Sequence, residues 1–235
     1  MRRLRVGASD RREVLVSMTH LLLGAVLLGN LGACATAQEM LTPPSQVRFK
    51  STDFRNVLHW TPPTNSSSLL YNVQWKIYGE PDWLNAESCQ GIHKRHCDLS
   101  GVTSKTSEWY YARVCASSAP SGSRSAWALT PRFSPRWDTK ISPPSLRASV
   151  SKQGIMVQVK ASRGLVRKMH QNLLYNVYVI HANKSEEVFE VNCCSEQLIL
   201  SKMNPRTKYC LQAQTVIPWH FKSSDRCAAK CVKTP

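Results

Sequence analysis

Four side chains of the metal-ligand type stand close together in the first half of the chain. Cys89, His93, His96 and Cys97 have the spacing C-x3-H-x2-H-C, and Zn²⁺ is commonly bound by thiolate and imidazole. The two cysteines are also near enough in sequence for a local disulfide, which would stabilise a loop of this size by about 2.6 kcal/mol. The redox compartment decides between these interpretations, because disulfides persist in oxidising surroundings.

The N-terminus indicates a secreted protein. The first twelve residues carry five arginines, Leu21–Leu31 is apolar, and Ala35-Thr36-Ala37 matches an A-x-A cleavage site. The apolar run is shorter than the roughly 20 residues of a spanning helix. We expect residues 1–37 to be a signal peptide, with translation starting at Met1 or Met18, and the mature chain to be secreted without a membrane span.

The cysteine count and the sequons fit the same compartment. All nine cysteines except Cys34 follow the leader, and an even number is typical of a disulfide framework. The sequons Asn65-Ser66-Ser67 and Asn183-Lys184-Ser185 predict glycosylation at Asn65 and Asn183. Disulfides are therefore favoured over zinc, and we expect no metal or cofactor.

The chain is strongly basic and lacks catalytic signatures. A net charge of +16 in a secreted protein could meet heparan sulfate, nucleic acid or an acidic protein surface. We favour a scattered soluble surface, because the longest basic cluster, His93-Lys94-Arg95-His96, is short and no nucleic-acid motif accompanies it. No G-x-S-x-G, H-E-x-x-H, P-loop or dinucleotide fingerprint occurs. We predict neither an enzyme nor a nucleic-acid partner.

The elements that position these residues come in two copies. Leu69–Val73 recurs identically as Leu173–Val177, 104 positions later, and Pro43-Pro44-Ser45 recurs 100 positions later. Tyr110 and Tyr209 are a third landmark at an offset of 99. Three landmarks in order at nearly one offset indicate a duplicated domain. We place the domains at 38–140 and 141–235, with a join between Asp138 and Pro143. We expect limited proteolysis to cut there or in exposed loops rather than inside the repeats.

Each copy has the period of β-strands. Apolar Tyr71, Val73, Trp75 and Ile77 alternate with polar neighbours, and prolines interrupt the pattern at short intervals. Tyr209 follows a turn, so its hydroxyl could bond backbone a few residues upstream as a tyrosine corner. The predicted fold class is all-β, two tandem fibronectin type III-like β-sandwich domains.

An ordered set of short motifs resembles the class II cytokine receptors. It comprises Trp75–Gly79, Cys89 and Cys97, Asp98–Ser100, Trp109–Val114, Arg132–Pro135 and Thr139–Pro144. The resemblance covers nearly the whole chain after the leader and is looser in the second domain. There Lys184–Ser201, with the vicinal pair Cys193-Cys194, departs from the family pattern.

This resemblance implies a ligand-binding surface made of loops. In the family a Tyr-Gly between two strands of the first domain inserts into the cytokine, and here it is Tyr78-Gly79. Further contacts are implied for the turn 99–105, the hairpin 117–124 and the second-domain loops 165–170 and 217–221. Trp219 and Phe221 could instead cover their own sandwich. The expected contact residues are Lys76, Tyr78, Gly79, Ser100, Thr103, Pro120, Arg124, Pro218, Trp219, His220 and Phe221.

The remaining cysteines allow several pairings. Cys210 and Cys231 could face each other across a hairpin centred on His220 and Phe221, and Cys210 with Cys227 fits nearly as well. The resemblance implies Cys210–Cys231 and Cys89–Cys97. Cys115 lies opposite the apolar face of its strand, so we expect it to point outward. Cys193 or Cys194 could pair with Cys227, which would leave a free thiol or an intermolecular bridge.

The resemblance also implies a function. We expect a monomeric receptor that binds a helical cytokine of the interleukin-10 family, with interleukin-22 as the expected ligand, and antagonises signalling as a decoy. The alternative is a soluble splice form of a membrane-anchored class II receptor, or a tissue factor-like ectodomain. A fibronectin-type adhesion module would leave the cysteine loop and the motifs around the join unexplained.

Overall fold

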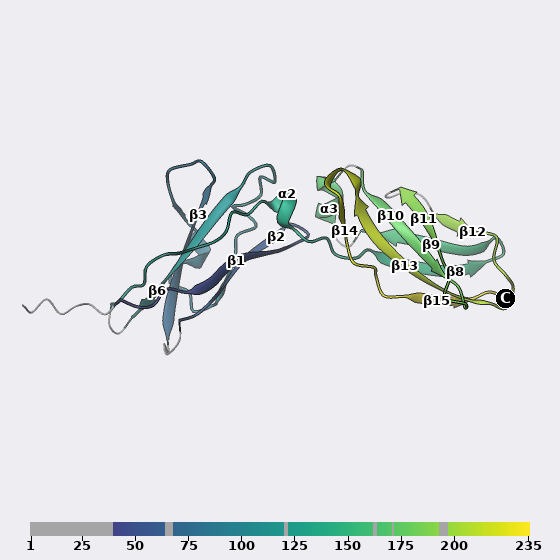
Figure 1. Cartoon of the computed structure of the whole chain (residues 1–235), viewed down its shortest axis with the longest axis horizontal. Coiled ribbons are helices and arrows are strands. Elements are labelled where there is room, and N and C mark those ends of the chain that lie inside the picture. The colour runs from purple at the N-terminus through teal and green to yellow at the C-terminus, as the bar shows by residue number, and fades with distance from the viewer. Residues whose placement is uncertain (1–39, 64–67, 120–121, 162–163, 171, 193–196) are drawn as a thin grey trace, which may run out of the picture. The chain divides into compact units, whose positions relative to one another are not determined.

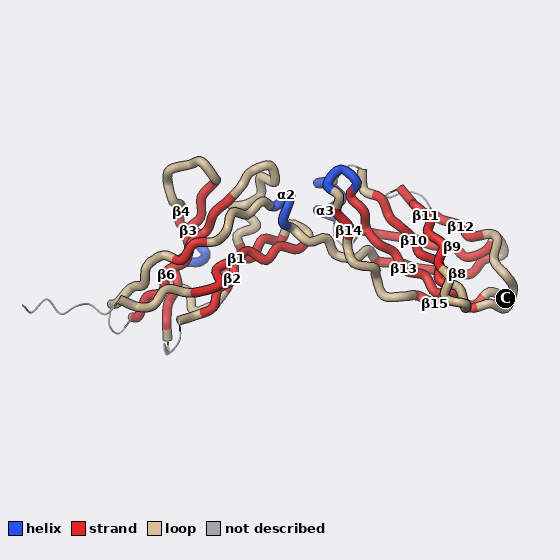
Figure 2. The backbone as a smooth tube through the Cα atoms, viewed as in Figure 1, coloured by secondary structure: helices blue, strands red, loops and turns tan. Residues whose placement is uncertain are grey.

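The computed structural model describes residues 40–63, 68–119, 122–161, 164–170, 172–192 and 197–235. The predicted signal peptide, Asn65, Pro120, Cys193 and Cys194 lie outside these ranges. Leu41–Pro235 forms one compact unit. Strands predominate, as Figure 2 shows in red, and the longest described helix has six residues. The predicted all-β class is confirmed.

The first sandwich packs two antiparallel sheets (Figure 1). One has the order β1-β2-β5, with β1 at Ser45–Thr52, β2 at Arg55–Thr61 and β5 at His96–Asp98. The other has the order β4-β3-β6-β7, with β4 at Leu84–Asn85, β3 at Leu69–Ile77, β6 at Tyr110–Ser118 and β7 at Ala128–Leu129. The short helices η1 (Glu87–Cys89) and α2 (Pro135–Asp138) follow β4 and β7.

The second sandwich repeats this plan. One sheet has the order β12-β9-β8, at Leu198–Leu200, Gly154–Lys160 and Ser145–Ser151. The other has the order β11-β10-β13-β14, at Glu186–Asn192, Leu174–Ile180, Lys208–Ile217 and Lys222–Ser223, and β15 (Lys230–Lys233) also pairs with β13. Helix α3 (Gly164–Met169) precedes β10, and η2 (Pro218–His220) follows β13.

Alternating burial explains why these segments form strands. Along β13 every second side chain, from Tyr209 to Ile217, is buried, as expected for a strand with one face on a core. The repeated Leu-Leu-Tyr-Asn-Val opens β3 and begins one residue before β10, and its tyrosines Tyr71 and Tyr175 are both buried. The duplication seen in the sequence is therefore a duplication of the central strands. The domain boundaries placed at residues 140 and 141 stay a prediction.

Both sandwiches contain the tyrosine-led strand. The Tyr209 hydroxyl accepts a hydrogen bond from the Asn204 backbone N–H at 3.0 Å, which confirms the predicted tyrosine corner. Tyr110 is the first-sandwich counterpart, and its hydroxyl donates to the Lys105 carbonyl oxygen at 3.0 Å. Each bond ties the turn before a core strand to that strand.

The cysteines confirm part of the expected pairing and correct part of it. Disulfides join Cys89 to Cys97 and Cys210 to Cys231, so the two cysteine sulfurs of the zinc-like motif are bonded to each other. Cys227 is free, so its proposed bridge to Cys193 or Cys194 is wrong. The hairpin argument also placed Cys227 close to the strand that contains Cys210. Cys227 does lie there, and its sulfur accepts a hydrogen bond from the Ala213 N–H of β13 at 3.2 Å.

Cys115 is also free, and its thiol is buried. Alternation places it opposite the core face, as predicted, but that face is covered. Asn72 on the paired strand hydrogen-bonds the thiol, and Arg113 and Arg124 lie near it. Burial raises the pKa of the Cys115 thiol above its ordinary value, because the thiolate would lose its hydration.

Candidate functional site

The Tyr78-Gly79 turn presents an aromatic ring at the end of β3. The Tyr78 N–H donates to the Trp109 carbonyl oxygen at 2.7 Å, and the Glu80 N–H donates to Ile77 at 3.2 Å. Gly79 has φ +93°, a conformation that L side chains rarely adopt. The turn therefore needs this glycine, and it leaves the Tyr78 side chain 55% exposed.

The exposed ring is held from one side by Arg132. The Arg132 guanidinium carbon lies 5.3 Å from the Tyr78 ring centroid and 4.2 Å from that of Trp109. The Tyr111 ring is 6.1 Å from the Tyr78 ring. Cation–π contacts of this kind restrict the ring before any partner arrives. Sequence reasoning missed Arg132 and Trp109 as supports, although both lie in motifs that carry the family resemblance.

A second cation–aromatic stack supports the loop that follows. Arg113 lies 4.2 Å from the Trp83 ring centroid and 4.5 Å from that of Trp127, and its Nη2 donates to Gln74 Oε1 at 2.6 Å. Lys76, a predicted contact residue, donates from Nζ to the Glu80 carbonyl oxygen at 3.0 Å and lies 5.1 Å from the Trp83 ring. Lys76 therefore helps to close the β3–β4 loop.

In the turn after β5, one predicted contact residue is accessible to a ligand and the other is buried. Ser100 is partly exposed and accepts a hydrogen bond from the Asn56 N–H at 2.9 Å. Thr103 is fully buried, donates to the Leu99 carbonyl oxygen and accepts from the Asn56 side chain, each at 2.8 Å. The ligand contact predicted for Thr103 is wrong, because its side chain stabilises the turn from inside.

The hairpin 117–124 and the Tyr78 turn lie at opposite ends of the same sheet. In the antiparallel register Ile77 pairs with Tyr110, whereas Leu69 pairs with Ser118. The loop after β6 is therefore about 27 Å from the loop after β3, at roughly 3.4 Å per residue. Arg124 is exposed there, so its ligand contact stays a prediction, at a place separate from the Tyr78 turn. Pro120 in the same hairpin lies outside the described residues.

The predicted second-domain loops come together at one end of their sheet. Leu174 pairs with Val216, so α3 before β10 and η2 after β13 share an end. Trp219 is 76% exposed and Phe221 is fully exposed at φ +50°, so neither covers its own sandwich. Pro218 opens η2, and the Phe221 N–H donates to the Pro218 carbonyl oxygen at 3.1 Å.

A cluster of basic side chains lies next to Trp219. The His170 and His220 rings are 5.1 Å apart, and Lys222 donates from Nζ to the Thr139 carbonyl oxygen at 2.8 Å. Burial, with His220, Lys222 and Arg136 nearby, lowers the pKa of His170 to about 4. Burial and neighbouring Arg136 and Lys222 lower the pKa of His220 as well. A hollow of about 330 Å³ opens beside both rings.

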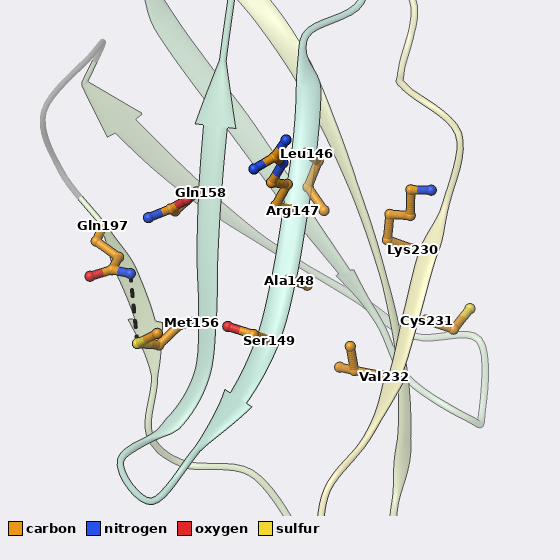
Figure 3. A pocket seen from close by; sticks show the side chains of 10 residues that line it. All are labelled: Leu146, Arg147, Ala148, Ser149, Met156, Gln158, Gln197, Lys230, Cys231 and Val232. Atoms are coloured by element: carbon orange, nitrogen blue, oxygen red, sulfur yellow. Dashed lines mark hydrogen bonds between the residues drawn. The ribbon is translucent and has the colours of Figure 1, made fainter.

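The described residues include neither a metal-binding group nor a membrane-spanning helix. No group of three or more His, Cys, Asp or Glu side chains that could hold a metal ion occurs among them. In the same ranges, no helix is long and apolar enough to cross a membrane. A hollow of about 490 Å³ is lined by residues of β8, β9 and β15 and by Gln197. Figure 3 shows these side chains, with the Gln197 amide donating to the Met156 sulfur of β9 at 3.6 Å. We assign that hollow no part in the candidate site.

The described architecture defines a class of protein: tandem fibronectin type III-like sandwiches that present rigid aromatic loops. Comparisons with known proteins agree. The family model described as Tissue factor matches residues 17–127, and that described as Interferon-alpha/beta receptor, fibronectin type III, matches residues 139–235. The chain is 32% identical to interleukin-22 receptor subunit alpha-2 of Mus musculus, over 92% of this chain and 98% of that protein.

Two further relatives show the breadth of the resemblance. Interleukin-20 receptor subunit alpha of Mus musculus is 32% identical over 83% of this chain and 37% of its own length. The crystal structure of the chicken interferon gamma receptor alpha chain matches with a TM-score of 0.71 at 24% identity, over 82% of this chain and 98% of that one. The latter bears on the fold alone. The chain belongs to the class II cytokine receptor family.

Proposed function

We propose that this chain binds a helical cytokine of the interleukin-10 family, with interleukin-22 as its ligand, and withholds that cytokine from signalling receptors as a secreted, monomeric decoy. The observation that carries the proposal is the Tyr78 ring, exposed on a glycine turn and held by Arg132. The near full-length match to a relative named interleukin-22 receptor subunit alpha-2 supports the choice of ligand.

The energetics of a protein interface favour such a surface. A standard interface buries roughly 1,600 Å² in total, and a few buried Tyr, Trp and Arg side chains contribute most of the binding free energy. Tyr78, Trp219 and Phe221 all present large apolar area to solvent. Because Arg132 already restricts Tyr78, less conformational entropy is lost when the ring is buried.

Sequestration needs binding alone. A receptor chain that covers the helical surface used by a signalling chain lowers the free cytokine concentration by mass action. The secretory route predicted from the sequence fits this role, and Asn183 lies in an exposed turn where a glycan could be attached. N-terminal sequencing of protein from culture medium should begin at or near Gln38, whereas an intact Met1 or Met18 in the membrane fraction would contradict secretion.

The test is binding followed by signalling. The purified secreted protein should bind interleukin-22 in surface plasmon resonance and less tightly, or not at all, other cytokines of the interleukin-10 family. Added to cells that respond to interleukin-22, it should shift the cytokine dose curve to higher concentration. A shift to lower concentration would indicate a carrier or agonist, and no binding to any member of the panel would end the proposal.

A further inference from the structure

The outer face of the β1-β2-β5 sheet carries a row of cations. Alternation turns Val47, Leu58 and Cys97 toward the core. The register then places Arg48 of β1 opposite His59 of β2, and His59 opposite His96 of β5. Adjacent strands are about 4.8 Å apart, so these three side chains form one band across the sheet. We call this band and its neighbours Lys50, Lys94 and Arg95 the basic face.

The loop before β5 extends the band in a fixed position. The Trp60 N–H donates to the Arg95 carbonyl oxygen at 3.3 Å, and the Cys89–Cys97 disulfide closes the segment from beneath. His93, Lys94, Arg95 and His96 are all exposed. The basic cluster that stood out in the sequence is therefore held against the edge of the sheet, and the proposed function makes no use of it.

The charges on the basic face are almost uncompensated. Asp98 is the acidic residue on the described strands of this face, and its carboxylate already pairs with Arg55 at 3.1 Å and accepts from Ser100. In the part of the chain that the structure describes, no carboxylate pairs with Arg48, Lys50, Lys94 or Arg95. Like charges at this spacing repel, and a polyanion laid along the sheet would relieve that repulsion.

The two histidines add a response to pH. Their rings are stacked at 5.8 Å. Burial, then Lys50, His96 and Arg48, lower the pKa of His59. The other charged or titratable groups of the basic face and its hollow are Arg48, Lys50, Arg55, His93, Lys94, Arg95 and Asp98, of which only Asp98 is negative. A bound polyanion would reverse the sign of this field and favour the protonated rings.

The chemistry of the face selects among polyanions. A hollow of about 480 Å³ beside the band is lined by Arg55, His93, Lys94 and His96, together with Asp98 and several apolar side chains. Its basic side chains outnumber the one carboxylate, which already pairs with Arg55, so the rim suits anionic groups. Nucleobases require aromatic platforms for stacking, and the described outer-face side chains of these three strands include no Phe, Tyr or Trp. The disulfide beneath the face belongs to an oxidising compartment, where sulfated polysaccharides are the abundant polyanions.

We propose that the basic face binds a sulfated glycosaminoglycan chain. Tyr78 belongs to the opposite sheet of the same sandwich, so a bound polysaccharide leaves the Tyr78 turn open. The two sites therefore act separately: one anchors the protein in the sulfated matrix, and the other contacts the protein ligand. The inference goes beyond the proposed function and does not depend on it.

The test uses the full secreted protein on immobilised heparin. The parent should remain bound at about 0.15 M NaCl, the physiological ionic strength. Arg48→Ser/Lys50→Ser/Arg95→Ser should elute at clearly lower salt, with a salt-dependence slope reduced by roughly three, because each lost cation releases one fewer counterion. The matched control, Arg147→Ser/Lys230→Ser/Lys233→Ser, removes three exposed cations from the second sandwich and should elute like the parent.

Several results would overturn the proposal. If both triple variants elute at equally reduced salt, net charge alone governs retention. The same conclusion would follow if double-stranded DNA competed for the protein as well as heparin does at equal charge. Elution of the parent below 0.15 M NaCl would also end it. If the first triple variant unfolds, Arg48→Gln and Arg95→Gln alone should each lower the elution salt. Binding to interleukin-22, measured on the same variants, should not change.

The histidines give an independent measurement. Lowering the pH from about 7.5 to 5.5 should strengthen retention of the parent, because the pKa of His59 lies below the ordinary histidine value and a bound polyanion favours the protonated rings. His59→Gln/His96→Gln should clearly reduce that gain while binding heparin normally at pH 7.5. A gain of the same size in the double variant would show that these rings do not contact the polysaccharide.

Discussion

At the scale of single residues, the surface chemistry depends on side chains that are exposed and yet restrained. Tyr78 is 55% exposed, but its neighbours are a glycine turn, the Trp109 carbonyl oxygen and the Arg132 guanidinium. An exposed ring without such contacts would lose rotamer freedom on binding. We therefore predict that Arg132 contributes to binding by restraining Tyr78, although it was not among the residues predicted from the sequence.

Tyr78→Ala should weaken binding of interleukin-22 by about 2 kcal/mol or more, which is a typical hot-spot loss of roughly 30-fold in Kd. Stability should change little, because the side chain is largely in solvent. Surface plasmon resonance and thermal unfolding measure the two effects. Val188→Ala, which truncates a side chain of the same 55% exposure on β11, is the control. Unchanged affinity in Tyr78→Ala would refute the contact carried over from the family.

His170 should make the protein less stable in acid. Its pKa is lowered to about 4, chiefly by burial, whereas an unfolded histidine titrates near 6.5. Between these values the unfolded chain binds more protons, so the free energy of unfolding falls as pH drops from 6.5 toward 4, by up to about 3 kcal/mol. His170→Gln should flatten this part of the urea-unfolding profile, and the exposed His93→Gln should not. Parallel profiles for parent and His170→Gln would contradict the assignment.

At the scale of elements, strand pairing decides which loops can act together. Period-two alternation and the repeated Leu-Leu-Tyr-Asn-Val predicted β3 and β10 well, because burial along a strand is a local property of sequence. Pairing direction is not local. The hairpin with Arg124 was assigned to the Tyr78 surface on resemblance alone, and the Ile77–Tyr110 register places it at the far end. The burial of Thr103 likewise depends on Asn56 of another strand.

Gly154, at the start of β9, lies close to the backbone of β12 in the second sandwich. It follows the β8–β9 turn at φ +127°, and a Cβ there would lie 2.1 Å from the Leu200 carbonyl oxygen of β12. Gly154→Ala should therefore destabilise the protein by at least about 2 kcal/mol, measured by urea unfolding. Gly101→Ala meets nothing within 4 Å and should be nearly neutral. Equal stability of the two variants would mean that β12 moves away without cost.

At the scale of the whole molecule, the segment after α2 makes hydrogen bonds to the β1–β2 turn and to Lys222 of the second sandwich. Its backbone pairs with the β1–β2 turn through Asp53 N–H to Lys140 O at 2.8 Å and Lys140 N–H to Ser51 O at 3.0 Å. The Thr139 hydroxyl oxygen accepts from the Phe54 N–H at 2.9 Å, and the Thr139 carbonyl oxygen accepts from Lys222. From sequence, prolines and polar residues suggested an open join. Those residue types show where regular strands end but not whether backbone groups are paired.

The Lys140–Ile141 bond should therefore resist trypsin even though Lys140 is exposed. A protease needs several residues of backbone free of hydrogen bonds, and this segment must first detach from the β1–β2 turn. Asp53→Ala removes the carboxylate that accepts the Ser142 N–H at 2.8 Å, so cleavage at Lys140 should become at least about tenfold faster, in proportion to the larger open population. The exposed Asp82→Ala is the matched control and should be cleaved like the parent.

Mass spectrometry of early digests identifies the site by two fragments that meet at residues 140 and 141. If Lys140 is among the first bonds cut in the parent, the segment is open in solution and the hydrogen bonds to Ser51 and Asp53 do not hold it.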